Sequence, residues 1–257
     1  MWSLAILALL GTRLTATAAA QLRAANDARN QAQAEAAADG AIRQAMFVLL
    51  GGGEIGTATK PMRVRIGGAA VDVVAEDQAG KINPNSVSPT VLRGLLAALG
   101  VDPPLAARLA GEIADWRNRS LDSSLGGKKI DAYRDHGLPY RSGDHRFQSV
   151  DEIGLVADMT PEILDRLRPW LSVYEEGDVK ESGGASPVAA AIGDARMLNP
   201  AAGQPLAASR NVILRVTATA VLRGPARFVR SAVLRMRASP GPEPARVAEL
   251  IQVLAWE

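Results

Sequence analysis

The sequence predicts an α+β protein: a long N-terminal helix packs on an antiparallel sheet, and an all-helical domain is inserted between the strands of that sheet. Three observations carry this prediction. The first fifty residues have helical character and contain no proline, strand patterns occur both before and after the middle of the chain, and the middle itself has helical periodicity. Strands and helices that are segregated along a chain, and do not alternate, are typical of the α+β class.

Composition limits the chemistry that the chain can perform. The 257 residues include no cysteine, so disulfides, thiolate metal sites and cysteine nucleophiles are excluded. The net charge of +2 gives no strong case for nucleic-acid binding. A hydrophobic fraction of 47% is ordinary for a globular protein, although aromatic residues are scarce at 4%.

Residues 1–50 are predicted to form a membrane and assembly helix. Residues 16–45 are rich in alanine, the best helix former, and a helix from Leu4 to Leu50 would be ~70 Å long. The rest of the chain cannot cover such a helix, so we expect it to project. Its first part is apolar up to Arg13, and the side chains expected to contact lipid or other subunits are Leu4, Ile6, Leu7, Leu9, Leu10 and Leu14.

The apolar start has three interpretations. A membrane span needs about 20 apolar residues, and this run is about half as long. A secretory signal would have small residues after the apolar core, as here, but also a basic start, which this run lacks. We favour the third interpretation, in which Met1 falls inside a longer apolar segment, because helical character continues without a break past the potential cleavage site.

The end of the long helix is predicted to dock on the sheet through an apolar stripe, and three glycines then end the helix. Residues 51–80 supply the first strand pair of the head, turning at Gly67-Gly68, and residues 210–257 supply three more strands. The segment 176–209 is rich in Gly, Pro, Ser and Ala and is interpreted as a linker loop. The stripe consists of Ile42, Met46, Leu49 and Leu50.

Residues 81–175 are predicted to form the helical insertion domain, with about five short helices. Pro89 and Pro103 suit first helical turns, and Ser149 with Glu152 has the spacing of a capping box. The insert also carries several short motifs in a fixed order. Their main residues are Gly80, Lys81, Ile82, Asn83, Asn85, Asp115, Trp116, Phe147, Ser149 and Glu152.

This order of motifs resembles that of minor pseudopilin K of type II secretion systems (general secretion pathway protein K). The resemblance rests on the Ala-Gly-Lys-Ile-Asn-Pro-Asn segment 79–85, the Ile-Ala-Asp-Trp-Arg segment 113–117, the Pro-Tyr pair 139–140 and the Phe-Gln-Ser-Val-Asp-Glu segment 147–152. It covers nearly the whole chain. It implies a type IV pilin-like fold, with a helix-hairpin-helix or SAM-like insertion.

The resemblance also implies a function. A minor pseudopilin K would sit at the tip of the pseudopilus, where its bulky insert prevents further subunits from stacking. It would initiate assembly and help drive folded proteins across the outer membrane. Its partners would be the I and J minor pseudopilins, and it would be a single-pass inner-membrane protein with its head in the periplasm. It would need no cofactor and bind no nucleic acid. Some members of the family bind calcium, although no ligands can be assigned in this chain.

Two other functions are weighed against this one. Helix-hairpin-helix proteins of the competence or DNA-uptake type share the 82–99 pattern, but here the hairpin Leu99–Pro104 contains two prolines and Asp102, which suit phosphate poorly. His136 and His145, each beside an aspartate, suggest an enzyme site, but we interpret them as solvated loop residues and expect no catalytic or metal-ligating residue. The arginines of residues 212–237 are likewise interpreted as a solvated sheet face, with the binding of an acidic partner surface as the alternative.

Overall fold

The computed structural model describes residues 2–174, 187–198, 211–222, 226–237 and 251–257. Two compact units divide the chain. The sheet unit consists of Met1–Asp77 and Leu214–Glu257, and the helical unit consists of Gln78–Ile213. Each unit has its own apolar core.

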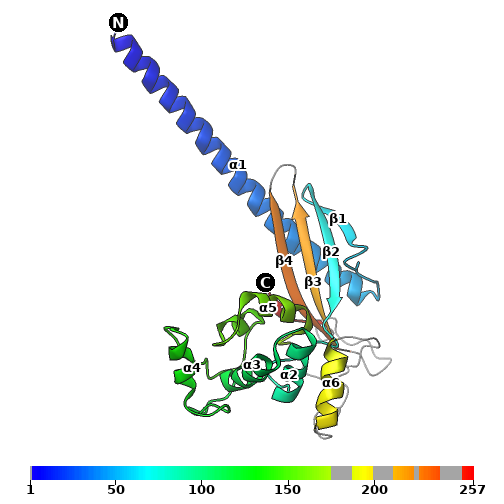
Figure 1. The fold of residues 1–257 in the computed structure, drawn as a ribbon. Coiled ribbons are helices and arrows are strands. Elements are labelled where there is room, and N and C mark those ends of the chain that lie inside the picture. Colours follow the sequence, from blue (N-terminus) through cyan, green and yellow to red (C-terminus); the bar gives the residue numbers. More distant parts are fainter. Residues whose placement is uncertain (1, 175–186, 199–210, 223–225, 238–250) are drawn as a thin grey trace. The chain divides into compact units, whose positions relative to one another are not determined.

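The sheet unit is built on five strands in the order β1-β2-β3-β4-β5. Figure 1 labels the first four of them. β1 (Met62–Ile66) and β2 (Ala69–Asp77) form an antiparallel hairpin in which Ile66 pairs with Ala69. The turn residues Gly67 and Gly68 have φ of 57° and 85°, which glycine adopts without strain. The other strands are β3 (Asn211–Val221), β4 (Arg227–Arg237) and β5 (Ile251–Trp256).

β2 and β3 are neighbours although the helical unit separates them in sequence. They pair antiparallel from Ala70 opposite Val221 to Asp77 opposite Leu214. The chain therefore leaves the sheet at Asp77 and rejoins it opposite the same point, so an insertion there leaves the register of the sheet unchanged.

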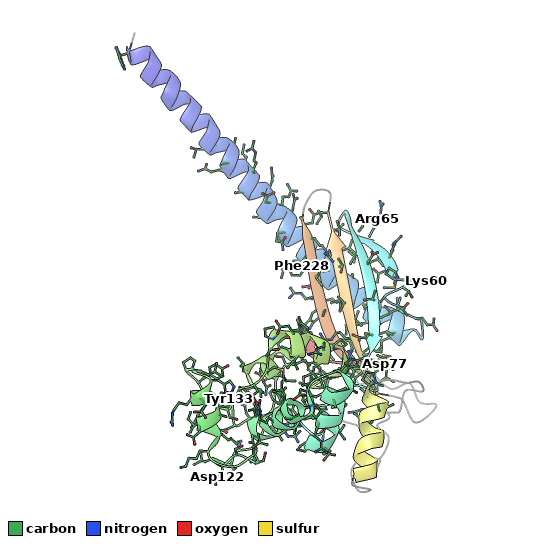
Figure 2. All side chains as sticks on the ribbon, viewed as in Figure 1. Lys60, Arg65, Asp77, Asp122, Tyr133 and Phe228 are labelled. Carbon is green, nitrogen blue, oxygen red and sulfur yellow. The ribbon has the colours of Figure 1, made fainter. Side chains whose placement is uncertain are left out.

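Helix α1 (Trp2–Leu50) packs on one face of this sheet through its C-terminal third. Its contact surface is mostly alanine, and Gly40 lies so close to the sheet that an added Cβ would be 3.4 Å from Ile66. Small side chains let helix and strands approach closely. The predicted stripe contributes here: Ile42 is fully buried, and the other three residues of the stripe pack at the edge of the same core, as does Phe228 of β4 (Figure 2). The fully or almost fully buried residues of the helix are Ala34, Ala37, Ala38, Ala41, Ile42 and Ala45.

The exposed part of α1 precedes this contact. Residues 20–29 are all exposed, and in Figure 1 the helix continues well past the last strand that it covers. The side chains of residues 3–16, and so of the six predicted membrane and assembly residues, lie outside the described part of the chain. Among the helices that the structure describes, none has a stretch long and apolar enough to cross a membrane.

Arg230 corrects the interpretation of the strand arginines as a solvated face. Its guanidinium on β4 lies 2.6 Å from Glu35 Oε1 and 2.9 Å from Asp39 Oδ1, both on α1, and stacks over the ring of Phe228. Only 23% of the Arg230 side chain is exposed. Arg230 therefore joins sheet to helix, which a strand pattern alone does not reveal because the partners are almost 200 residues away.

The helical unit contains four short α-helices and two 3-10 turns among residues 78–174, and one further helix among residues 187–198. They are α2 (Pro89–Ala98), α3 (Pro103–Trp116), α4 (Lys129–Asp135), η1 (Asp151–Leu155), α5 (Pro161–Leu167), η2 (Arg168–Trp170) and α6 (Pro187–Leu198). Proline begins four of these helices, where the missing N–H has no helical partner to lose. Ser88 and Thr160 cap α2 and α5 by accepting from the amides of Val91 and Ile163.

The predicted linker 176–209 is wrong over residues 187–198, which form α6. Val188, Ala191 and Ile192 of this helix are buried in the core of the helical unit. α6 crosses α2 where Gly94 has no side chain, since an added Cβ would lie 3.0 Å from the Cα of Ala191. The alanine-rich segment that we interpreted as a loop therefore forms a helix that packs closely on α2. Residues 175–186 and 199–210 lie outside the described part of the chain.

One smaller prediction differs from the structure: the helix predicted from Ser149 is a 3-10 turn, η1. The last strand is predicted over residues 247–256; β5 lies within it, and residues 247–250 lie outside the described part of the chain.

Candidate functional site

The motif residues of the helical unit gather around the C-terminal end of α3. Trp116, only 3% exposed, stacks on Phe147 with ring centroids 5.6 Å apart and an interplanar angle of 9°. Tyr133 and His145 complete the ring contacts of the tryptophan, with centroids 6.4 and 6.1 Å away. Gly143 lies against the indole, because an added Cβ would be 2.7 Å from its Cε2 and Cζ2 atoms.

Asp115 holds the loop that follows α3. Its carboxylate accepts from Ser123 Oγ at 2.6 Å and from the amide of Ser124 at 3.0 Å, and only 5% of the residue is exposed. Leu125 of the same loop covers Gly111, where an added Cβ would be 2.7 Å from Leu125 Cδ2. A buried carboxylate whose acceptors are used by the chain itself has a structural role.

The two asparagines of the Lys-Ile-Asn-Pro-Asn motif join segments distant in sequence. Asn85 Oδ1 accepts from the amide of Phe147 at 2.7 Å, and Asn85 Nδ2 donates to the carbonyl of the same residue at 3.0 Å. Asn83 Oδ1 accepts from the amide of Asn85, and its Nδ2 donates to the carbonyl of Val173 at 3.4 Å. An asparagine side chain carries the same donor and acceptor groups as a peptide bond. Asn83 and Asn85 therefore hydrogen-bond to distant backbone segments as a neighbouring strand would.

The other motif residues position the chain locally. Ile82 is fully buried and forms an isolated parallel bridge with Leu171. Gly80 has a φ of 86°, which the turn after β2 requires, and the amide of Lys81 closes that turn on the carbonyl of Gln78. Ser149 Oγ accepts from the amide of Glu152, whose carboxylate accepts in turn from the amide of Gln148.

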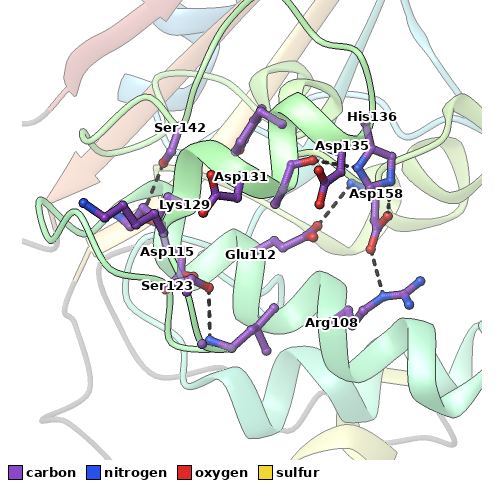
Figure 3. A pocket seen from close by; sticks show the side chains of 16 residues that line it. Arg108, Glu112, Asp115, Ser123, Lys129, Asp131, Asp135, His136, Ser142 and Asp158 are labelled. Atoms are coloured by element: carbon purple, nitrogen blue, oxygen red, sulfur yellow. Dashed lines mark hydrogen bonds and ion pairs between the residues drawn. The ribbon is translucent and has the colours of Figure 1, made fainter.

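A cavity of about 380 Å³ lies beside α3 and α4 (Figure 3). Asp158 sits at its edge and is paired on both sides, with His136 Nε2 2.6 Å from one oxygen and Arg108 Nε 2.9 Å from the other. The Asp158 amide donates to Glu112 Oε2 at 3.1 Å. His136 is exposed, as predicted, but it is paired with Asp158 and does not face solvent alone.

The protonation of this cluster is shifted from ordinary values. Burial, with a contribution from the Asp158 carboxylate, raises the pKa of Glu112 to about 7. The hydrogen bond of His136 to the carbonyl of Ala132, together with Asp158, raises the pKa of the imidazole. A perturbed carboxyl in a cavity can mark a catalytic site. Here, however, Glu112 accepts a hydrogen bond from the amide of Asp158, and the Asp158 carboxylate is paired with Arg108 and His136. The cluster therefore links α3, α4 and the segment before α5.

Lys129 is the charged residue that the sequence did not single out. Its side chain is 6% exposed, and Nζ donates to the carbonyls of Asp115 and Asn118 and pairs with Asp144 Oδ1 at 3.4 Å. No pattern marks it, because its neighbour Lys128 has the same charge and is exposed. Among the described residues, no group of three or more acidic or histidine side chains is placed to hold a metal ion.

The hairpin between α2 and α3 uses its amides within the chain. The amide of Gly100 donates to the carbonyl of Ala97 at 2.9 Å and that of Val101 to the carbonyl of Leu96 at 3.0 Å. Pro103 and Pro104, which follow, have no N–H to offer. A helix-hairpin-helix module binds DNA phosphate through free amides at this position, and this hairpin leaves neither of those two free.

Residues 70–176 match the model of a family described as type II secretion system (T2SS), protein K. This part of the chain therefore resembles the T2SS protein K family. The match spans the β2 strand and most of the helical unit, including every motif from which the resemblance was inferred, so that resemblance is confirmed.

A solved structure supports the same fold over almost the whole chain. The crystal structure of the GspK-GspI-GspJ complex from the enterotoxigenic Escherichia coli type 2 secretion system contains a chain that matches with a TM-score of 0.61. The alignment covers 94% of this chain and 98% of that chain at 15% sequence identity. The predicted α+β class is confirmed by this likeness and by the five-stranded sheet. No curated protein sequence matches the chain.

Proposed function

We propose that the protein is a minor pseudopilin that caps the tip of a type II secretion pseudopilus, initiates its assembly and helps to drive folded proteins across the outer membrane. The observation that carries the proposal is helix α1. Its C-terminal third is buried on the sheet, whereas residues 20–29 are exposed on every side. A single helix of alanine and polar residues gains little stability in water unless it packs on something.

The packing partners of this exposed helix are, on our proposal, the equivalent helices of the I-type and J-type minor pseudopilins. Its small side chains favour such packing, because helices lined with alanine approach closely. The solved relative with the same fold was crystallised as a complex named GspK-GspI-GspJ. The first residues of α1 would lie in the inner membrane before assembly, with both compact units in the periplasm.

The helical unit contributes bulk and rigidity to this cap. Its motif asparagines, Asp115 and Trp116 use their polar atoms and rings to hold segments of the unit together. T2SS pseudopilins are structural proteins, and we propose no catalytic activity for the chain. An inserted domain of this size on one pseudopilin head would obstruct a subunit added above it, which suits a terminal position.

Secretion by a complemented deletion strain tests the proposal. Leu7→Lys places a charge in the apolar start of α1, where a central charge costs about 3 kcal/mol of insertion free energy. We expect the Leu7→Lys variant to abolish export of the secreted substrates while its periplasmic head remains folded and protease-resistant. Thr59→Lys, in an exposed loop, is the matched control and retains export. Normal export by the Leu7→Lys strain contradicts the proposal.

A further inference from the structure

The buried ammonium of Lys129 stands at the centre of a group of oxygen atoms. Its three N–H donors meet three acceptors: the carbonyl of Asp115 at the end of α3, the carbonyl of Asn118 just beyond it, and a carboxylate oxygen of Asp144. An ammonium has three donors and no acceptor, so this set matches its capacity. The three acceptors come from two segments, residues 115–118 and the loop at Asp144, which Lys129 joins.

The segment that supplies Asp144 is shaped for this contact. Asp144 has a φ of 54°, the one positive value among the non-glycine residues that the structure describes. A left-handed aspartate is uncommon, and its backbone is strained unless its surroundings hold it. Gly143 packs on Trp116 on one side of it, and Ser142 Oγ donates to the carbonyl of Asp115 at 3.4 Å. The strained residue is thereby held with its carboxylate at the ammonium.

Carbonyl and carboxylate oxygens are also the ligands of Ca²⁺, which takes six to eight of them at about 2.3–2.6 Å. In this chain, the centre of such an oxygen group is filled by a positive charge on a four-carbon stem. A divalent ion at the same point would meet the lysine charge at contact distance, with a single carboxylate to balance both. This group of oxygen atoms therefore fits an ammonium and does not fit calcium.

We propose that Lys129 serves as a tethered cation that does the structural work of a bound metal ion, so that the helical unit is locked without calcium. In this respect the chain would differ from the calcium-binding members of the family that it resembles. The inference concerns the stability of the helical unit and does not depend on the proposed role at the pseudopilus tip.

Thermal unfolding of the full chain, with millimolar calcium or with a chelator, tests the first half of this inference. We expect the same Tm in both solutions. Lys129→Met should lower Tm by about 6 °C or more, because it leaves the Asp144 carboxylate and two carbonyls without their cation. The matched control is Lys128→Met, at the exposed neighbouring lysine, which should leave Tm unchanged. A saturable rise of the wild-type Tm with calcium, or equal Tm values for the two variants, overturns the proposal.

A charge exchange tests the second half. Lys129→Glu removes the ammonium and adds a carboxylate to the same oxygen group, which then has the composition of a calcium site. We expect a variant with a low Tm in chelator and a Tm that rises saturably with calcium. Absence of any calcium response in this variant contradicts the idea that Lys129 occupies a cation position. In the wild type, NMR should detect a lysine ammonium protected from exchange that Lys129→Met abolishes, and its absence counts equally against the proposal.

Discussion

At the scale of single residues, the polar motif side chains of this chain act on their own backbone. Asn85 replaces a sheet partner for Phe147, and Asp115 replaces a turn for the loop at Ser123 and Ser124. Buried polar groups are tolerated only when their hydrogen bonds are satisfied, so each of these side chains fixes a defined local geometry. The motif residues resemble catalytic or binding residues in the sequence, but in the structure they hold segments of the helical unit together.

The contact of Gly143 with Trp116 gives a prediction about packing. Gly143→Ala places a methyl group 2.7 Å from two indole atoms, and we expect it to lower the free energy of unfolding by about 1–3 kcal/mol. The control is Gly193→Ala on α6, where the added methyl meets nothing within 4 Å. There the gain in helix propensity should stabilise by up to about 1 kcal/mol. Chemical denaturation measures both, and equal effects at the two sites would show that the indole can move aside.

Glu112 and His136 predict how stability changes with pH. The Glu112 carboxyl has a pKa of about 7 in the folded protein, against an ordinary 4.5. Its contribution to stability is complete where the carboxyl is protonated in both the folded and the unfolded protein. This contribution is lost as the pH rises from about 4.5 to 7. The raised pKa of His136 acts in the same direction, since its contribution is present below about pH 6.5 and lost above. Burial of Glu112, with Asp158 beside it, is the main cause of its raised pKa.

The free energy of unfolding should therefore fall between about pH 4.5 and pH 7. Glu112→Gln keeps the shape of the side chain but cannot titrate, so its decline over this range should be smaller, with the remainder due to His136. Glu54→Gln, at an exposed position of the sheet unit, should decline as the wild type does. Urea denaturation at a series of pH values measures this, and an unchanged slope in Glu112→Gln would mean that the buried carboxyl is not the titrating group.

At the scale of elements, hydrophobic periodicity predicted the helices and strands whose own sequence shows which face packs on the core. The alternation of Met62 to Ile66 and the glycine pair after it define the β1–β2 hairpin, and the stripe from Ile42 to Leu50 marks the docking end of α1. α6 escaped prediction because alanine and glycine carry no strong pattern. Its place depends on Gly94 of another helix, which only the folded chain brings near.

The candidate site was predicted in its apolar part and missed in its charged part. The burial of Trp116 follows from its place on the inward face of the amphipathic helix α3. Lys129 and Glu112 look like ordinary surface charges in the sequence, since their burial results from contacts with residues as far apart as Asp115 and Asp158. Arg230 is the same case in the sheet unit, since its partners on α1 are set by the fold alone.

At the scale of the whole molecule, the helical unit is inserted between two strands of the sheet unit, and the sheet keeps its strand pairing. Asp77 and Leu214 pair as neighbours in β2 and β3, so the inserted residues begin and end at one point of the sheet. Each unit has its own core. A pilin-like head can therefore carry a large additional domain, and α1 is left free to make contacts along residues 20–29.

Copurification tests the central claim, that this exposed helix assembles with other minor pseudopilins. The full chain, coexpressed with I-type and J-type pseudopilins of the same system, should be recovered as a stoichiometric ternary complex. Leu22, a large apolar side chain that is 66% exposed on α1, is the residue to change. We expect Leu22→Glu to weaken the complex about tenfold or more, by the loss of one apolar contact. Ala20→Glu, on the opposite side of the helix, should be milder. A full chain that recovers neither partner would contradict the account.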